Sequence, residues 1–197
     1  MVFISYYTKG TPYEDVIKSH LLPSLYKWNL KCDIEAIEDL GDWYANTGYK
    51  PRHILKMLLK YREDVVFNDS DAVIEKYPAL LSQIPEKEDM ACHFLDWYRF
   101  WRGIEGNPKR ELLSGTMLWR YRPKVIDLLE KYISLCQKYP TTWEQKILQN
   151  ILSECNDYQI YDLPVEYCTI IRRDGTYPAY IKEPVILHYQ ASRQYKR

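Results

Sequence analysis

The segment DVVFNDSDAV, residues 64–73, brings two carboxylates to the end of an apolar run. The run 65–67 predicts a short strand that is buried on both faces. In an extended segment, Asp69 and Asp71 point to the same side, about 6–7 Å apart. They can then converge on one hard cation, Mg²⁺ or Mn²⁺, which keeps coordination places for substrate phosphates. Asp69 could instead cap a turn through its own backbone, with no functional role. The position of the motif directly after a buried strand favours the metal-binding interpretation.

A histidine inside the apolar segment 185–190 offers a nitrogen ligand for the same ion. Imidazole is a common ligand of transition metals, and His188 is followed by Arg193, Lys196 and Arg197. A cation ligand followed by clustered positive charge suits a diphosphate. A core histidine with a satisfied hydrogen bond would give the same pattern, and this alternative stays open.

The composition describes an ordinary globular chain of 197 residues, with 46% hydrophobic and 27% charged residues. Lysine plus arginine and aspartate plus glutamate are equal at 27 each, which argues against a surface built for nucleic acid. The 19 tyrosines and 6 tryptophans suit a pocket for sugars or bases, but tyrosine also fills half-buried surfaces.

The cysteines lie far apart and form no CxxC pair, which predicts reduced thiols in a cytoplasmic protein. They are Cys32, Cys92, Cys136, Cys155 and Cys168. The first ten residues do not resemble a signal peptide, and no apolar run approaches the length of a membrane span. We therefore expect no transmembrane segment.

The spacing of apolar residues changes between strand-like and helix-like along the chain, and it indicates the elements that position these side chains. Strands are predicted at 2–7, 31–38, 65–67, 90–95, 111–120 and 185–190, with shorter pieces near 158–161 and 167–171. Helices are predicted to begin near Pro12 and Pro51 and to cover 123–138 and 142–154. Early strands and helices alternate, which predicts an α/β fold with a mainly parallel sheet flanked by helices in a single domain. Ligands of such sheets bind beyond the carboxyl ends of the strands, where the two aspartates lie.

These pieces also resemble a known family. VFISYYT, KPRHILKMLLKY, DVVFNDSDAVIEKYP, LLSGTMLW, WEQKIL and VILHYQASRQYK follow, in the same order, the layout of small GT-A glycosyltransferases of the nucleotide-diphospho-sugar transferase type. The layout is most similar to that of the retaining galactosyl- and glucosyltransferases related to glycogenin. The resemblance implies one Rossmann-like GT-A domain over 1–197, with a nucleotide-binding half at 1–75 and a sugar and acceptor half at 76–197.

The resemblance implies that Asp69, Asp71 and His188 bind Mn²⁺ or Mg²⁺. The ion would bridge the phosphates of a nucleotide sugar, UDP-linked by preference, and would assist departure of the diphosphate. The sugar would pass to a carbohydrate or another hydroxyl acceptor, and an oligomer could complete the acceptor site. The nucleotide and diphosphate contacts implied are Tyr6, Tyr7, Thr8, Lys50, Arg52, Ser70, Arg193 and Lys196.

On the sugar side, the resemblance implies contacts from Asp96, Ser114, Gly115 and Thr116. Leu113 replaces the family's asparagine and removes its hydrogen bonds. Glu144 and Gln145 match an acidic-Gln pair near the reacting carbon. Thr141-x-x-Glu144 also forms a capping box, which explains Glu144 without chemistry, so Gln145 is the better site residue. No nucleophile or catalytic base is assigned, and positioning and electrostatics would do most of the work.

Two other functions fit parts of the pattern. A metal-dependent nucleotidyltransferase also uses two aspartates near a strand end, but it usually needs a glycine-rich phosphate loop or a third carboxylate. It would release pyrophosphate from a nucleoside triphosphate. A non-catalytic carbohydrate- or protein-binding domain would treat DSD as a turn, and chelating divalent cations would not weaken its binding. Its surface would be Phe94, Trp97, Tyr98, Phe100 and Trp101.

Overall fold

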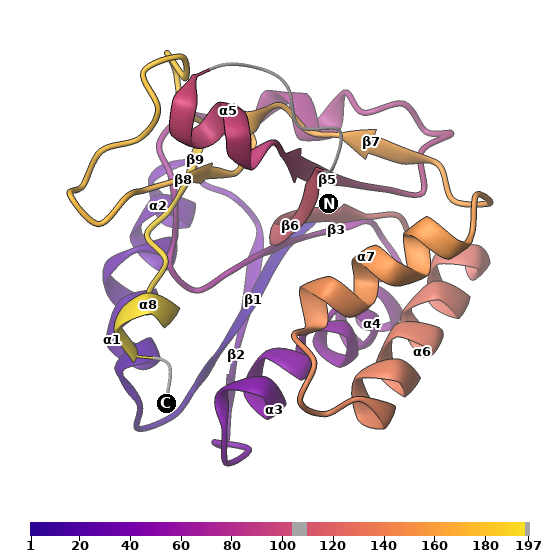
Figure 1. The fold of residues 1–197 in the computed structure, drawn as a ribbon. Helices are drawn as coiled ribbons and strands as arrows, with labels where there is room; N and C mark the ends of the chain where they lie inside the picture. The colour runs from indigo at the N-terminus through magenta and orange to yellow at the C-terminus, as the bar shows by residue number, and fades with distance from the viewer. Residues whose placement is uncertain (104–109, 196–197) are drawn as a thin grey trace.

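The computed structural model describes residues 1–103 and 110–195. Its main sheet has six strands in the order β2-β1-β3-β6-β5-β7. The strands are β1 (Val2–Thr8), β2 (Cys32–Ile37), β3 (Val65–Asn68), β5 (Met90–Leu95), β6 (Glu111–Trp119) and β7 (Ile160–Asp162). Figure 1 shows this sheet at the centre of the molecule, between two groups of helices.

The pairing within this sheet is mixed. β1 lies parallel to β2 and to β3, and β5 lies parallel to β7. β6 runs antiparallel to both of its neighbours, β3 and β5. Parallel pairs are therefore the majority, as predicted, and the long strand β6 reverses direction in the middle of the sheet. In this pairing, Thr116 of β6 lies opposite Asn68, the last residue of β3, directly before Asp69.

A second sheet has three short strands in the order β4-β9-β8. β4 (Ala72–Ile74) pairs antiparallel with β9 (Ile186–His188), and β8 (Thr169–Ile170) pairs parallel with β9. The strand predicted at 185–190 therefore belongs to this small sheet and is only three residues long. Because Ala72 is the register partner of His188, the small sheet brings the C-terminal histidine beside the aspartates.

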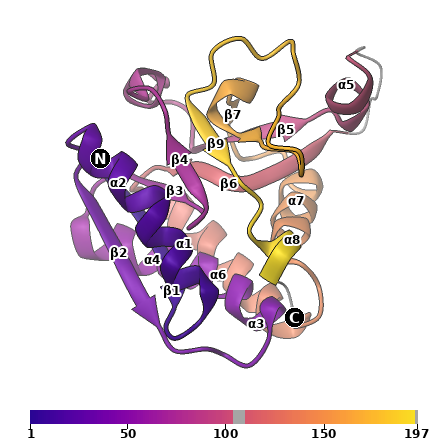
Figure 2. The same cartoon turned by 90° about the vertical axis from the view of Figure 1, so that its left-hand side faces the viewer.

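One face of the main sheet packs against α4 (Lys50–Tyr61), α6 (Pro123–Lys138) and α7 (Glu144–Glu154). Alternate strand residues, whose side chains point to this face, pack against Leu58 of α4 and Leu128 of α6 in this core. They include Val2, Ile4 and Phe67. Figures 1 and 2 show these helices together on one side of the sheet.

The opposite face packs against α1 (Pro12–Ser19), α2 (Leu21–Lys27) and the small sheet. Phe3 and Val66, which alternate with the residues of the first core, contact Leu21 and Leu25 of α2 and Ile74 of β4. Both faces are thus covered, which explains why Val65, Val66 and Phe67 of β3 are all apolar. Pro12 occupies the first turn of α1, as the sequence indicated, and the Thr11 side chain caps this helix at its N-terminus.

The structure adds elements that the periodicity did not reveal. They are the helices α3 (Trp43–Gly48), α5 (Trp97–Arg102) and α8 (Ser192–Tyr195), the strand β4, and the 3₁₀ turns Ala79–Ser82 and Val165–Tyr167. Each has six residues or fewer, too short for a helical or strand period to show in the sequence. No helix in the described ranges is long and apolar enough to cross a membrane.

Candidate functional site

A cavity of ≈ 640 Å³ opens where β1, β3 and β6 approach the small sheet and the N-terminus of α7. This volume lies within the range of about 300–1,000 Å³ that small-molecule sites occupy. Most residues predicted for the site line it. They are Tyr6, Tyr7, Thr8, Lys50, Asp69, Ser70, Asp71, Ser114, Gly115, Glu144, Gln145 and His188.

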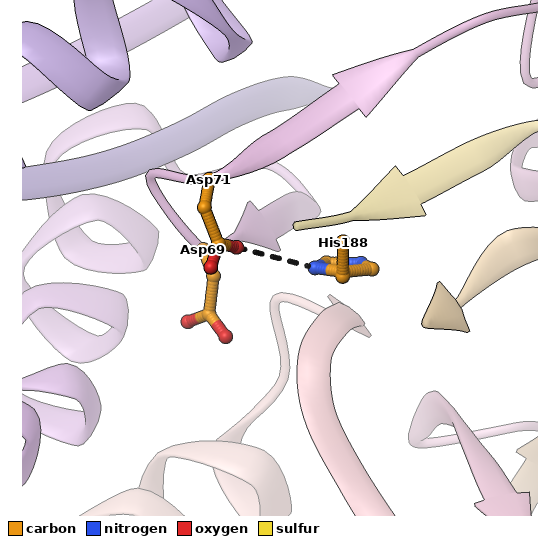
Figure 3. Close-up of side chains that lie close together, drawn as sticks. All are labelled: Asp69, Asp71 and His188. Atoms are coloured by element: carbon orange, nitrogen blue, oxygen red, sulfur yellow. Dashed lines mark ion pairs between the residues drawn. The ribbon is translucent and has the colours of Figure 1, made fainter. Parts of the chain in front are cut away.

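The two aspartates and the histidine form a compact group of ligand atoms. One atom from each of Asp69, Asp71 and His188 lies within 4.8 Å of the others. Figure 3 shows the three side chains close together, with Asp71 pointing toward His188 and the Asp69 carboxylate below them. The His188 Nδ1 atom is 3.7 Å from Asp71 Oδ1. Two carboxylates and an imidazole match the ligands that a Mn²⁺-type cation takes in proteins.

Gly115 makes room for this group. A Cβ atom at this position would lie 2.8 Å from His188 Cε1, closer than nonbonded carbon atoms approach, and 3.3 Å from Asp69 Oδ2, a tight contact. The Gly115 carbonyl also accepts a hydrogen bond of 2.9 Å from the Asp69 amide. The neighbouring Thr116 hydroxyl is hydrogen-bonded to His188 Nε2 at 2.9 Å, which leaves Nδ1 facing Asp71. Such a partner fixes the ring of a metal-binding histidine.

Lys50 lies at the centre of a second, buried network. Its Nζ atom is 3.0 Å from Asp69 Oδ1, 2.8 Å from Glu144 Oε1 and 2.9 Å from Ser114 Oγ. Only 4% of Lys50 is exposed, and its pKa is raised because Asp69 and Glu144 outweigh the effect of burial. The lysine therefore stays charged and joins the aspartate pair to the N-terminus of α7.

Glu144 and Gln145 both point into this network. The Ser114 hydroxyl donates to Glu144 Oε1 at 2.8 Å, and the Ser114 amide donates to Gln145 Oε1 at 2.9 Å. The capping-box interpretation of Glu144 is wrong, because α7 has no side-chain cap and Glu144 is 1% exposed. Leu113, at the position of the family's asparagine, lines the cavity with an apolar side chain.

Asp71 also fixes the C-terminal segment. Its Oδ2 atom accepts a hydrogen bond of 2.7 Å from the Ala191 amide, and its carbonyl accepts one of 3.3 Å from the Tyr189 amide. The pKa of Asp71 is lowered, because the contacts with His188 and Ala191 outweigh burial. Burial also disfavours the charged His188 ring, yet the neighbouring Cys168 and Asp71 raise its pKa to about 10. α8 then lies across the cavity, with Ser192, Gln194 and Tyr195 in its lining.

The predicted nucleoside contacts lie at the carboxyl end of β1. The Tyr6 hydroxyl donates to the Asn46 carbonyl of α3 at 2.8 Å, so this tyrosine fixes α3 against the sheet. The Thr8 and Thr11 hydroxyls are 2.8 Å apart. The Tyr7 ring lines the cavity and has no such structural hydrogen bond among those of the described residues.

Several predicted residues lie elsewhere. Arg52 is exposed on α4 and does not line the cavity. Asp96 caps α5 by accepting hydrogen bonds from the Tyr98 and Arg99 amides, at 2.8 and 3.1 Å. Arg193 is exposed, and its Nη1 atom donates to the Ile171 carbonyl at 3.3 Å. Lys196 lies outside the described residues.

The structure also adds lining residues that sequence reasoning missed. α3 contributes Trp43, and Trp143 precedes Glu144, with the two indole centroids 6.0 Å apart. Trp97 of α5 and Glu111 of β6 line the cavity near Gln145. The sequence offered one signal for α3, because Asp42 is a strong N-cap residue and its side chain accepts from the Ala45 amide.

Comparisons with known proteins bear on the family and the fold. The family model described as nucleotide-diphospho-sugar transferase matches residues 41–197. Curated proteins give no match. Among solved structures, a glycosyltransferase involved in the glycosylation of the major capsid of PBCV-1 is similar, with a TM-score of 0.70 and 15% identity over 96% of this chain and 92% of that one.

Two further structures have the same arrangement. Mouse xyloside xylosyltransferase 1 gives a TM-score of 0.55 and 14% identity, over 98% of this chain and 99% of that one. GlyE of Streptococcus pneumoniae TIGR4, also a glycosyltransferase, gives a TM-score of 0.56 and 14% identity. That match covers 95% of this chain but only 54% of GlyE. At these identities the likeness shows a shared fold.

Proposed function

The chain belongs to the nucleotide-diphospho-sugar transferase family and is a glycosyltransferase of the GT-A fold, and we propose that it transfers a sugar from a UDP-sugar to an acceptor hydroxyl with a divalent cation bound by Asp69, Asp71 and His188. The observation that carries this proposal is the convergence of these three side chains at the cavity. The close approach of Gly115 supports it, because only glycine leaves space for the histidine and the first aspartate together.

The donor set fits Mn²⁺ or Mg²⁺. When bound, the cation would neutralise charge on the departing diphosphate. The chain's own residues orient this site. Lys50 fixes the Asp69 carboxylate, Thr116 fixes the His188 ring, and the Ala191 amide fixes Asp71. Each proposed ligand thus has a protein partner that limits its rotation, as metal ligands usually do.

The proposed donor lies from the end of β1 toward α7. Tyr7 and Thr8 would contact the nucleoside, and Ser70 the diphosphate. Ser114, Glu144 and Gln145 would surround the sugar, since their hydrogen bonds hold the amide and carboxylate groups at the cavity. Arg193 remains a proposed diphosphate contact that would require the C-terminal segment to close over the donor, and Lys196 also remains a proposed contact. Arg52 and Asp96 would likewise require a rearrangement to reach it.

Retention of configuration is part of the proposal. The carboxylates closest to the proposed sugar position, Asp69 and Glu144, each place an oxygen against the Lys50 ammonium, at 3.0 and 2.8 Å, so these oxygens are already engaged in an ion pair. This arrangement supports a reaction that depends on positioning rather than on a side-chain base. The anomeric configuration of the product, measured by NMR, tests it. The five cysteines are free thiols, which supports the proposal of a cytoplasmic enzyme.

Calorimetric titration of UDP and of GDP, with Mn²⁺ and then with EDTA, tests the donor site. We expect Mn²⁺-dependent binding of UDP that is lost in Asp71→Ala. Asp127→Ala, at an exposed position on α6, is the matched control and should bind as the unaltered protein does. Binding that survives both EDTA and Asp71→Ala would contradict the proposed cation site. Absence of nucleotide binding under every condition would overturn the proposed function.

A further inference from the structure

The cavity has an end that the proposed donor contacts leave unused. Trp97, Glu111 and Leu113 line it, next to Gln145. It lies beside α5 and the start of β6, whereas the proposed nucleoside contacts lie at the end of β1. A ligand at this end would therefore approach the proposed sugar position from the side opposite to the nucleotide.

The Trp97 ring is held in place from several directions. Its Nε1 atom donates a hydrogen bond to Glu111 Oε2. The Phe100 ring packs edge-on against it at 5.4 Å, and the Trp101 ring lies nearly parallel at 6.4 Å and 15°. Its inner side packs on a buried cluster that includes Leu113. An indole that is fixed before binding presents a rigid apolar surface at little entropic cost.

Glu111 connects this surface to the reaction centre. Its Oε1 atom accepts a hydrogen bond of 2.8 Å from Gln145 Nε2, while its Oε2 atom accepts from Trp97. A carboxylate oxygen can accept more than one hydrogen bond, so Glu111 keeps capacity for a ligand hydroxyl. A ligand bound at Trp97 would therefore contact Glu111. Glu111 in turn is hydrogen-bonded to Gln145, which is proposed to lie beside the reacting carbon.

Charge restricts what can bind at this end. Within the described residues, Lys50 is the only lysine or arginine that lines the cavity, and Asp69 and Glu144 already pair with it. Of the described residues that line the cavity, a ligand beside Trp97 would meet the Glu111 carboxylate and no unpaired lysine or arginine. An anionic acceptor would be repelled there, whereas hydroxyl groups could donate hydrogen bonds.

We propose that Trp97 and Glu111 form the acceptor subsite and that the acceptor is a neutral saccharide. The apolar face of one sugar ring would stack on Trp97, and its hydroxyls would donate to Glu111. This proposal rests on the proposed function. In the transfer, an acceptor hydroxyl oxygen forms the bond to C1 of the donor sugar. The bond between C1 and the diphosphate oxygen breaks, UDP leaves with that electron pair, and the hydroxyl proton leaves with the diphosphate.

The test measures UDP release from UDP-sugars in the presence of Mn²⁺, with and without acceptor probes. The probes are methyl glycosides of neutral hexoses and pentoses, the matched methyl glucuronide, and a serine- and tyrosine-containing peptide. We expect at least one neutral glycoside to accelerate UDP release and to appear in the product. In Trp97→Leu, which keeps an apolar side chain but removes the ring, kcat/KM for that glycoside should fall by about tenfold or more.

Matched variants separate acceptor binding from folding. Trp97→Phe should recover part of the lost kcat/KM, because it restores an aromatic face. Glu111→Gln should raise KM for the glycoside, since the carboxylate is lost. Tyr98→Leu, on the same helix and outside the cavity lining, should transfer as the unaltered protein does. Calorimetric binding of UDP with Mn²⁺ should persist in Trp97→Leu and shows that the variant is folded.

The two proposals fail in different ways. If the unaltered protein binds UDP with Mn²⁺ but only the peptide or the glucuronide accelerates UDP release, the saccharide subsite is overturned and the donor site stands. Unchanged kcat/KM for the glycoside in Trp97→Leu also overturns the subsite. If no nucleotide binds to the unaltered protein, the proposed function fails, and the acceptor subsite fails with it.

Discussion

Lys50 shows how one side chain can join the two ends of a site. Its ammonium is nearly fully buried and has two carboxylate partners, Asp69 and Glu144, together with the Ser114 hydroxyl. The Nζ atom also lies 5.0 Å from the centre of the Phe67 ring. A buried charge is tolerable only when it is paired and hydrogen-bonded, and this lysine meets both conditions. It therefore connects Asp69 and Glu144, which lie 75 positions apart in the sequence.

Replacing Lys50 by methionine should destabilise the protein. The change leaves Asp69 and Glu144 close together without a cation, which should lower the free energy of unfolding by about 3–5 kcal/mol. Urea unfolding followed by tryptophan fluorescence measures it. Adding Glu144→Gln should recover part of the loss, because one unpaired carboxylate is removed.

Lys56→Met is the matched control for this substitution. Lys56 lies on the same helix and pairs with Glu35, but 53% of its side chain is exposed. Exposed ion pairs contribute about 1 kcal/mol or less, so this variant should be nearly neutral. Equal losses in the two lysine variants would contradict the role assigned to Lys50.

Gly115→Ala should disturb the proposed cation site with little effect on the rest of the protein. The added methyl group would displace the His188 ring and the Asp69 carboxylate. We expect Mn²⁺ affinity, measured by electron paramagnetic resonance, to fall by about tenfold or more, as it does when a metal ligand loses its orientation. In Gly48→Ala the methyl group meets no atom within 4 Å, so affinity should stay unchanged. Unchanged affinity in Gly115→Ala would place the cation elsewhere.

Among the secondary-structure elements, short strands and helices position much of the site. β4 and β9 have three residues each, and their pairing places His188 next to the aspartates. α5 has six residues and supplies Trp97 to the cavity. Helices of this length are unstable in isolation, so each depends on its caps and on tertiary packing. The αL conformation of Gly103, with φ 72°, ends α5 and favours glycine at this position.

Asp96 provides a test of such a cap. Asp96→Ala should lower the free energy of unfolding by about 1 kcal/mol, because two amides at the start of α5 lose their acceptor. Asp96→Asn should restore most of it, since asparagine is an equally good N-cap. Chemical unfolding measures both. If Asp96 instead contacts sugar hydroxyls, Asp96→Asn should keep its stability but lose transfer, which separates the two roles.

At the scale of the whole molecule, two cores sandwich the main sheet, and one histidine of α4 and one of β5 are buried. His53 is fully buried against Glu35, at 2.9 Å, and His93 is buried with its Nδ1 atom 2.7 Å from the Leu163 carbonyl. Burial lowers the pKa of both rings below the ordinary value of 6.5. The folded protein therefore keeps both rings neutral at a pH where the unfolded chain protonates them.

Stability should consequently decrease as the pH falls below about 6.5, until the folded-state pKa values are reached. The unfolded state binds protons that the folded state excludes, so the slope is at most about 1.4 kcal/mol per pH unit for each histidine. His188, with a pKa raised to about 10, is protonated in the folded state throughout this range, so it adds a small opposing slope near pH 6.5 that disappears as the unfolded chain becomes fully protonated. Urea unfolding from about pH 6.5 to about pH 5 measures the effect. His53→Gln and His93→Gln should each flatten the curve, and stability that rises over this range would refute it.

The sequence by itself determined the elements with a clear period. The helices at 50–61 and 123–138, the buried strand at 65–68 and the strand at 90–95 follow from local spacing of apolar residues. It also indicated the two aspartates at a strand end, because residue type and position along one strand are local properties. The resemblance to the GT-A glycosyltransferases depended on the order of such segments, and the family match confirms it.

Only the tertiary structure decided which side chains meet. Lys50 and Glu144, Asp71 and Ala191, and Trp97 and Glu111 are contacts between segments whose own patterns say nothing of each other. For this reason the sequence favoured a capping role for Glu144 and left Glu111 unassigned. Local periodicity reports which face of an element is buried, whereas the partner on that face is set by packing of the whole chain. The cavity, its charge and its two ends therefore emerged only with the fold.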